Sequence, residues 1–291
     1  MTKLGLVLEG GGMRGMFTAG ILDVFLERSI TFDGAIGTSA GALFGCNLKS
    51  RQHGRGLRYN VRYCRDPRYT GIFPLLLTGD IVSRKFAYEK VLRKLDPFDV
   101  ETYRKNPMEF WAVCTDVTTG SPLYHKCETM DAVDVEYLRA SASMPIVSRA
   151  VEIEGHKLLD GGISDPIPLK QFIRMGYEKN VVILTQPAGY RKRPSRSAGV
   201  AAASLRRYPA SAEAMRLRHI AYNQCLTFLK KEEARGRALL IRPEKPLKIG
   251  HICHDPGELI RVYEIGRGAA VRNMERIQEY LSETGAEKVL C

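Results

Sequence analysis

Short apolar runs that end in glycine-rich turns organise the first part of the chain. The run at 3–8 predicts a buried strand, and apolar positions recur at helical spacing over about 16–28. A second apolar run, 32–36, is followed by another helix-compatible segment at 40–49. Two successive strand–turn–helix units predict the beginning of a parallel sheet covered by helices.

The rest of the chain continues this alternation. Further strands are predicted at 109–114, 122–125, 180–185 and 239–241, with a hairpin at 151–159. Further helices are predicted from 80–83 to about 95, at 169–175, over much of 200–234 and at 255–281. Residues 50–108 are more irregular and rich in Arg and Tyr, and they form a wall of a substrate pocket or simply cover the sheet. The pattern as a whole predicts an α/β fold.

Composition places the chain among soluble globular proteins. Its 291 residues are 44% hydrophobic and 26% charged, which is enough for one large α/β domain or one with an appendage. Neither a signal peptide nor an apolar run of membrane-spanning length is expected. Seven cysteines, including Cys291, form no Cys-x-x-Cys pair and are typical of free thiols in a reducing compartment. We therefore predict a cytoplasmic protein.

The formal net charge of +12 points towards an anionic partner, either a membrane surface or a nucleic acid. Residues 190–218 carry a net +7, from eight basic residues and Glu213. The eight are Arg191, Lys192, Arg193, Arg196, Arg206, Arg207, Arg216 and Arg218. Because no zinc finger, RNP-like motif or aromatic stacking platform accompanies them, no nucleic acid is expected. This basic segment either contacts an anionic membrane peripherally, at its inner face, or is a solvated helix face and linker.

The pentapeptide Gly37-Thr38-Ser39-Ala40-Gly41 lies where the second predicted strand turns into a helix. A Gly-x-Ser-x-Gly turn in this position is typical of a nucleophile elbow, which strains the serine backbone and exposes Oγ at the strand's carboxyl end. The following helix presents free N–H groups to any anion formed beside Ser39. Alternatively, these residues serve only as turn and cap residues.

The loop Gly10-Gly11-Gly12-Met13-Arg14-Gly15 follows the first predicted strand and satisfies Gly-x-Gly-x-x-Gly. A dinucleotide site would need an acidic residue where the second strand ends, but the nearby acid, Asp33, lies at its beginning. We therefore interpret the loop as an oxyanion hole whose N–H groups point beside Ser39. Arg14 at its mouth either fixes the loop and attracts an anionic head group, or is merely solvated.

Asp160-Gly161-Gly162 follows the second arm of the predicted hairpin. Two glycines after a strand-end carboxylate allow another backbone loop to approach it. Asp160 can then take the serine proton directly, if partial desolvation raises its pKa towards the working range. The alternative is an ordinary Asp-Gly-Gly turn. Asp116 competes for the same role, although Thr118, Thr119 and Gly120 make it look like a turn former.

Histidines offer a different base and a possible metal site. A conventional triad would use His219, His251 or His254, but none of them lies in a glycine-rich strand-end loop. His251, Cys253 and His254 resemble metal ligands, yet no fourth ligand or suitable spacing accompanies them. We therefore expect no metal.

The chain resembles the patatin-like phospholipase family in three motifs that occur in this order. They are the loop from Leu8 to Gly15, the pentapeptide from Gly37 to Gly41, and Asp160-Gly161-Gly162. The resemblance covers about 4–186 and takes in the weaker blocks 116–120 and 141–145. It implies a three-layer α/β/α fold with a mostly parallel sheet, a Ser39–Asp160 dyad, and hydrolysis of lipid acyl esters without a metal or other cofactor.

Beyond about residue 190, the chain resembles the C-terminal extension of a bacterial cytoplasmic branch of the family. This implies a catalytic domain at 1–190 and a basic, mainly helical extension at 191–291 packed on it. The alternative function is a catalytically weak lipid-binding or partner-binding regulator on the same fold. The intact Ser39, Asp160 and glycine loop argue against that alternative.

Overall fold

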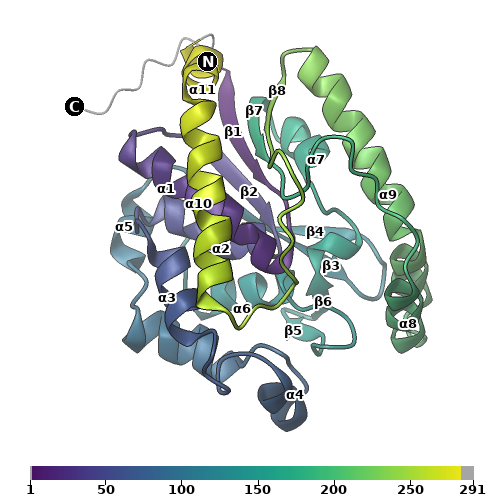
Figure 1. Cartoon of the computed structure of the whole chain (residues 1–291). Coiled ribbons are helices and arrows are strands. Elements are labelled where there is room, and N and C mark those ends of the chain that lie inside the picture. Colours follow the sequence, from purple (N-terminus) through teal and green to yellow (C-terminus); the bar gives the residue numbers. More distant parts are fainter. Residues whose placement is uncertain (1, 283–291) are drawn as a thin grey trace.

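The computed structural model describes residues 2–282, within which eight strands form one sheet (Figure 1). The strands are β1 (Lys3–Leu8), β2 (Gly34–Thr38), β3 (Glu109–Asp116), β4 (Pro122–Lys126), β5 (Val151–Ile153), β6 (His156–Asp160), β7 (Tyr177–Ile183) and β8 (Ala238–Ile241). Five of them, in the order β3-β2-β1-β7-β8, are parallel, while β4, β5 and β6 join by antiparallel pairing. The predicted α/β class with a mostly parallel sheet is confirmed.

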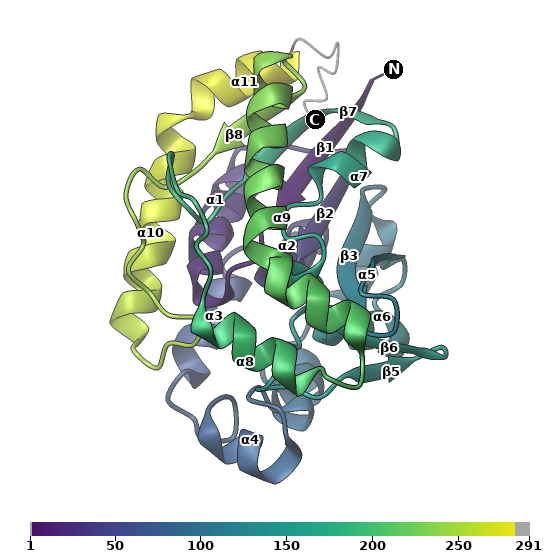
Figure 2. The same cartoon turned by 90° about the vertical axis from the view of Figure 1, so that its right-hand side faces the viewer.

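Helices cover both faces of the sheet, which gives the three layers seen in Figures 1 and 2. They are α1 (Gly15–Glu27), α2 (Ala40–Lys49), α3 (Arg55–Tyr63), α4 (Ile72–Thr78), α5 (Val100–Lys105), α6 (Ala132–Ser141), α7 (Leu169–Arg174), α8 (Arg196–Ser204), α9 (Pro209–Ala234), α10 (Pro256–Arg272) and α11 (Met274–Ser282). A π-helical segment, η2 (Arg84–Leu95), and two short turns, η1 (Gly12–Arg14) and η3 (Gly161–Ile163), complete the set.

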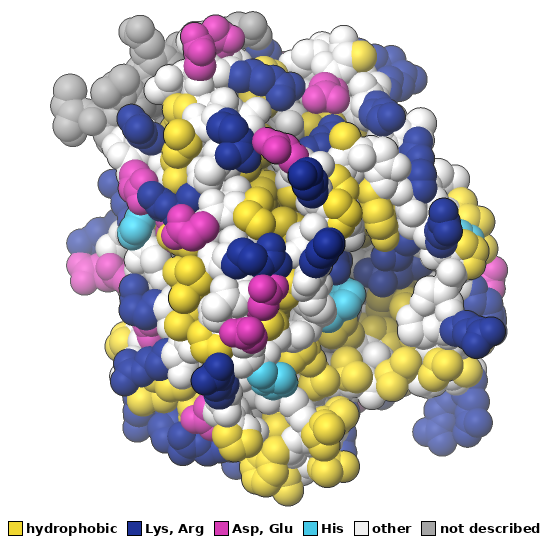
Figure 3. All heavy atoms as spheres, viewed as in Figure 1, with side chains coloured by type: hydrophobic (Ala, Val, Ile, Leu, Met, Phe, Trp, Pro, Cys, Tyr) yellow, Lys and Arg dark blue, Asp and Glu magenta, His cyan; other side chains and the backbone are white. Residues whose placement is uncertain are grey.

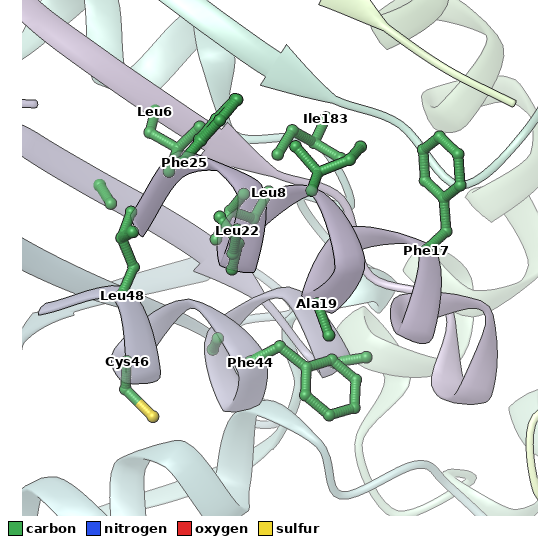
Figure 4. Close-up of a cluster of buried hydrophobic side chains, with 14 of the residues drawn as sticks. Leu6, Leu8, Phe17, Ala19, Leu22, Phe25, Phe44, Cys46, Leu48 and Ile183 are labelled. Atoms are coloured by element: carbon green, nitrogen blue, oxygen red, sulfur yellow. The ribbon is translucent and has the colours of Figure 1, made fainter. Parts of the chain in front are cut away.

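The central strand β1 is apolar from Leu4 to Leu8, where both of its faces are buried. Leu6 and Leu8 point into the core formed with α1, α2 and α10, whose buried side chains include Phe17 and Phe25 (Figure 4). Val7, between them, packs in the second core on the side of α7 and α9. The alternation follows from the two-residue period of a strand.

Two predicted long helices are each divided in the structure. The helix expected within 200–234 is broken between α8 and α9, and Pro209 begins α9. Proline is tolerated in the first turn but clashes with the carbonyl four residues earlier, so a helix cannot continue through it. The helix expected at 255–281 breaks at Asn273, whose side chain donates to the Ala269 carbonyl.

Residues after 190 contribute to the same sheet and to its covering layer. β8 pairs with β7, and α10 lies along α1 (Figure 1). The two helices approach closely because each has a glycine at the contact. A Cβ at Gly20 of α1 would overlap the Tyr263 carbonyl oxygen of α10, and a Cβ at Gly266 of α10 would overlap the Phe17 carbonyl oxygen of α1. A domain division at 190 stays a prediction. Within the described residues, no helix combines the length and the apolar character required to cross a bilayer.

Candidate active site

Ser39 occupies the turn between β2 and α2, and its backbone is strained. Its φ of 55° and ψ of −124° lie in a region that non-glycine residues rarely adopt. The flanking glycines make the turn possible: a Cβ at Gly37 would lie 2.6 Å from the Ala42 nitrogen, and one at Gly41 would overlap the Leu8 carbonyl. The local sequence therefore forms a tight elbow that presents the serine side chain at the end of β2.

Strand β3 brings Ser39 and Asp160 together. Thr38 at the end of β2 is paired with Val113, and Asp160 at the end of β6 is paired with Cys114, the next residue of β3. Since β4 occupies the opposite edge of β3 at both positions, β2 and β6 share one edge and meet end to end. The register of three strands thus fixes the two side chains beside each other.

The Ser39 hydroxyl donates a hydrogen bond of 2.7 Å to Asp160 Oδ2. The other oxygen, Oδ1, accepts the Gly162 N–H at 2.7 Å, so the carboxylate is held from both sides. Asp160 is only 5% exposed. Burial raises its pKa above the ordinary value, although the Ser39 hydrogen bond, the charge of Arg218 and the Gly162 N–H oppose that shift.

Ser141 is a contact of Ser39 that sequence reasoning did not single out. The Ser39 N–H donates to Ser141 Oγ at 2.9 Å, and that hydroxyl donates to the Val113 carbonyl at 2.6 Å. Ser141 therefore ties the elbow to β3 by a side-chain bridge. Its position in the weaker motif at 141–145 was the available signal, but the small residues there suggested only close packing.

The glycine loop curls beside the elbow. Gly10 is close enough that a Cβ there would lie 3.0 Å from Ser39 Cβ. The Met13 N–H donates to the His251 carbonyl and the Arg14 N–H to the Gly11 carbonyl. The N–H groups of Gly10, Gly11 and Gly12 have no such partner within residues 2–282. Among the amides of the loop predicted from the sequence, these three therefore lack a hydrogen-bond partner in the described part of the chain.

Gly12 and Gly15 also fix the shape of the loop. Gly12 has a φ of 58°, and a Cβ there would lie 2.6 Å from the His251 carbonyl oxygen. A Cβ at Gly15 would lie 2.7 Å from the Phe44 ring, so this glycine lets α1 pack on α2. Beneath the loop, Glu9 is buried and accepts hydrogen bonds from the Thr185 N–H (2.6 Å) and the Tyr222 hydroxyl (2.5 Å).

A small polar cavity opens beside the dyad and the loop. Ser39 and Asp160 line it together with three basic side chains, Arg14, Lys192 and Arg218. Burial and the two neighbouring arginines lower the pKa of Lys192 to about 8. Sequence reasoning placed Lys192 and Arg218 in a basic surface segment, and no motif in the sequence marks them as neighbours of Ser39.

Two family models match different parts of the chain. The model of the patatin-like phospholipases matches residues 6–173, more than half of the sequence. The chain belongs to the patatin-like phospholipase family. A second model, for a domain of unknown function (DUF6363), matches residues 208–282.

Individual relatives of this patatin-like protein cover it only in part. The uncharacterized protein YjjU of Escherichia coli is 33% identical over 195 residues, 64% of this chain and 53% of YjjU. Lysophospholipase nte1 of Aspergillus fumigatus is 28% identical over 182 residues, 60% of this chain and 11% of nte1. The solved structure of VipD from Legionella pneumophila matches 95% of this chain and 67% of its own, with 11% identity and a TM-score of 0.48. This chain therefore spans about half of YjjU and a small part of nte1.

A larger, mostly apolar cavity lies on the other side of Ser39 in this patatin-like protein. Its volume is about 130 Å³. Residues of the irregular segment 50–108 form much of its wall, together with α2 and α6; examples are Leu43, Tyr59, Val91 and Leu138. Figure 3 shows that this face of the molecule is hollowed between α10 and the side where α8 and α9 lie. Ser39 lines both cavities and therefore lies at their junction.

The residues that compete with Asp160 for the role of base are Asp116 and three histidines. Asp116 Oδ1 accepts the N–H groups of Thr118 and Thr119 and its Oδ2 contacts His156, as expected of a turn former. His219 and His254 contact backbone carbonyls through Nδ1. His251 does line both cavities, but burial and nearby cations lower its pKa to about 4, which makes it a weak proton acceptor.

One group of metal-ligand residue types occurs away from the elbow. Potential ligand atoms of His125, Cys127 and Asp134 lie within 4.8 Å of one another. Asp134 already accepts hydrogen bonds from His125 (2.7 Å) and from the Thr129 and Met130 N–H groups. These contacts explain the group as a link between β4 and the start of α6, and we assign it no metal.

Proposed function

We propose that this protein hydrolyses lipid acyl esters with Ser39 as nucleophile and Asp160 as its general base. The observation that carries the proposal is the 2.7 Å contact between the Ser39 hydroxyl and a buried carboxylate, at the junction of an apolar and a polar cavity. The family and the relative named as a lysophospholipase support the same substrate class.

In the first step, Ser39 Oγ attacks the ester carbonyl carbon while its proton passes to Asp160 Oδ2. The carbonyl oxygen becomes an oxyanion beside the free N–H groups of Gly10, Gly11 and Gly12. Asp160 then gives the proton to the departing alcohol, which leaves an acyl group on Ser39. In the second step, Asp160 takes a proton from water, whose oxygen attacks the acyl carbonyl, and returns that proton to Ser39 as the fatty acid leaves.

Each of the two cavities binds a different part of the substrate. The apolar cavity suits the acyl chain, because burying each methylene contributes about 0.8 kcal/mol. The polar cavity is then left for the alcohol side of the ester. The raised pKa of Asp160 favours its role as a base, because a proton acceptor works best when its pKa approaches the working pH.

The test is hydrolysis of p-nitrophenyl butyrate and of lysophospholipids by wild type, Ser39→Ala and Ser204→Ala. Ser204 is an exposed serine on α8 and serves as the matched control. We expect loss of nearly all activity in Ser39→Ala and full activity in Ser204→Ala. Equal activity in all three proteins would refute a Ser39 nucleophile, and lipid binding without hydrolysis by wild type would favour the regulator alternative.

We further propose peripheral contact with an anionic membrane through the basic segment 190–218. Six of its eight basic side chains are exposed, whereas Lys192 and Arg218 are half-buried towards the polar cavity. The six are Arg191, Arg193, Arg196, Arg206, Arg207 and Arg216. Each basic residue near such a surface contributes roughly 1 kcal/mol, and salt screens that attraction.

Co-sedimentation with vesicles of varied phosphatidylglycerol content tests this contact. Changing Arg191, Arg193 and Arg196 together to Ser should weaken binding, while changing the exposed Lys230 and Lys231 on α9 provides the control. Binding that is equal in all proteins, or indifferent to lipid charge, would leave the segment as a solvated surface.

A further inference from the structure

Three cations converge on the polar cavity from separate parts of the chain. Arg14 comes from η1, Lys192 from the loop after β7, and Arg218 from α9. Arg218 Nε donates to the Gly162 carbonyl at 2.5 Å, and the Lys192 ammonium lies 5.1 Å from the centre of the Tyr222 ring. Arg14 Nε is buried and has no hydrogen-bond partner within the described part of the chain. Its unsatisfied donor points to an acceptor that these residues do not provide.

No carboxylate neutralises this group directly. Within residues 2–282, none of the ion pairs involves Arg14, Lys192 or Arg218. Two buried acids, Glu9 and Asp160, line the same cavity and attract these cations at longer range. The oxygens of Glu9 accept hydrogen bonds from Thr185 and Tyr222, and those of Asp160 accept from Ser39 and Gly162. Mutual repulsion therefore remains among the three cations, and it helps to lower the pKa of Lys192 to about 8.

We propose that Arg14, Lys192 and Arg218 bind a phosphate group carried on the alcohol side of the substrate. The proposal rests on the hydrolase function above, because Ser39 separates the acyl cavity from this cationic cavity. A phosphate offers several acceptor oxygens, which suits two guanidinium groups and an ammonium. Two of the three cations lie outside residues 6–173, so the segment that follows the family match supplies most of the site.

The test compares kcat/KM for lysophosphatidic acid and for monoacylglycerol with the same short acyl chain, below micelle-forming concentration. Wild type should prefer the phosphorylated substrate, and Lys192→Met should reduce that preference about tenfold. Lys192→Arg should restore much of it. Arg193→Met, at an exposed neighbour, is the control and should leave the preference unchanged. A wild type without preference, or an equal loss in Arg193→Met, would overturn the proposal.

Binding provides a readout that does not depend on catalysis. Calorimetric titration of Ser39→Ala with glycerol 3-phosphate should show binding that weakens about tenfold on adding Lys192→Met. Inorganic phosphate should bind more weakly than glycerol 3-phosphate. If neither lipid is hydrolysed but glycerol 3-phosphate binds in this Lys192-dependent way, the hydrolase function fails and the phosphate site stands. Equally tight binding of inorganic phosphate without substrate preference would indicate a site for the free anion and would overturn the head-group assignment.

A second, independent feature is the exposed apolar face of α4. Ile72, Phe73, Leu76 and Leu77 are 73%, 53%, 81% and 68% exposed. Their spacing places them on one face of the helix. Figure 3 shows the resulting hydrophobic cluster at the end of the molecule where Figure 1 places α4. Large apolar side chains gathered in this way mark an interaction surface.

Residues that flank α4 line the apolar cavity next to Ser39. Thr70 and Val82, which form a bridge at the base of the α4 segment, both line that cavity, as does Ile81. The Ile81 N–H donates to the Val147 carbonyl at 2.7 Å, which attaches the segment beside the exposed Ile146. The exposed face of α4 and the apolar cavity are therefore parts of one local segment of the chain.

Charge around α4 fits the same kind of surface. The helix itself contains no acidic residue. Lys85 and Arg149 are exposed on the segments around it, whereas the exposed Arg68 and Arg84 are paired with Asp66 and Glu136. We infer that α4 inserts its apolar face into the surface of an anionic lipid layer, with Lys85 and Arg149 at the head groups.

Co-sedimentation with phosphatidylglycerol vesicles in 1 M salt tests α4 separately from charge attraction, because screening is then nearly complete. Leu76→Glu with Leu77→Glu should reduce the bound fraction about tenfold, while Val271→Glu, at an exposed apolar position on α10, should not. Equal binding of the two variants would overturn the inference. So would a wild-type dimer in light scattering that the α4 variant dissociates, because a second copy would then cover this face.

Discussion

Asp160→Asn tests the centre of the proposed mechanism with little change of shape. The amide can keep the acceptor for the Gly162 N–H, 2.7 Å away in the native protein, and can still contact Ser39 Oγ. It cannot accept the serine proton. Loss of a general base costs typically 10²–10⁴ in rate, which corresponds to about 3–5 kcal/mol in the activation barrier. If Ser39 and Asp160 act as one unit, the double variant with Ser39→Ala should be little worse than either single variant.

The same substitution should stabilise the fold at neutral pH. The pKa of Asp160 is raised in the folded protein, so the folded state resists ionisation more than the unfolded chain does. At a pH below the pKa of the unfolded chain, Asp160 is protonated in both states, and the free-energy cost of burying a charged carboxylate is absent. As the pH rises from the unfolded pKa to the folded pKa, wild type loses stability at a rate of about 1.4 kcal/mol per pH unit, whereas an Asn does not titrate. The stability advantage of Asp160→Asn should therefore grow with pH.

Two measurements on the same proteins check both parts. Ester hydrolysis from pH 5 to 9 should show a wild-type rate that falls on the acid side as Asp160 becomes protonated, and a small rate in the variant. Thermal unfolding should show that the stability of the variant relative to wild type increases as the pH rises above the ordinary pKa of an aspartate. Full activity in Asp160→Asn would remove Asp160 as the base and favour His251, which also lines both cavities. A stability advantage that shrinks with rising pH would contradict the burial argument.

Two further substitutions address the surroundings of the dyad. Gly11→Ala should lower kcat by about 10²–10³ if the loop shifts one donor amide, because its Cβ would lie 2.8 Å from Thr185 Oγ1; a variant that unfolds, or that changes only KM, would contradict this. Tyr222→Phe should lower the free energy of unfolding by about 1.5–3 kcal/mol, because it removes a hydrogen bond to the buried Glu9 carboxylate. Denaturant unfolding measures that loss, and Tyr190→Phe, on the ring packed against Tyr222, is the control that should change stability less.

The sequence predicted those features that depend on local pattern. The strand-end glycine motifs marked Ser39 and Asp160, and the structure brings these two side chains into hydrogen-bond contact. Period and composition located every strand of the sheet to within a few residues. They did not reveal that β2 and β6 share one edge of β3, because strand register depends on contacts between distant segments. That register is what makes the contact of Ser39 with Asp160 possible.

The charge pattern along the sequence indicated the net charge of the basic segment but not the location of its individual side chains. Eight basic residues in 190–218 were expected to act together at the surface, but Lys192 and Arg218 are half-buried and line the polar cavity. On α9, Arg218 and Tyr222 are four residues apart and therefore lie on one face, towards the site. A count of charges over a sequence window cannot distinguish the residues on that face from the exposed ones. The direction of α9, and hence the face that meets the cavity, depends on where the helix is broken, which Pro209 determines.

Glu9 shows why the site needs both ends of the chain. It directly follows the central strand and is 2% exposed, and its pKa is raised by that burial. A buried carboxyl group is costly unless hydrogen-bonded. The donors to its carboxyl group, the Thr185 N–H and the Tyr222 hydroxyl, both lie beyond residues 6–173. The glycine loop that starts at Gly10 is thus fixed at its base by residues that the patatin-like match does not include. Whatever boundary divides the chain into domains, segments after residue 173 donate hydrogen bonds to the buried Glu9 and also line the cavity beside Ser39.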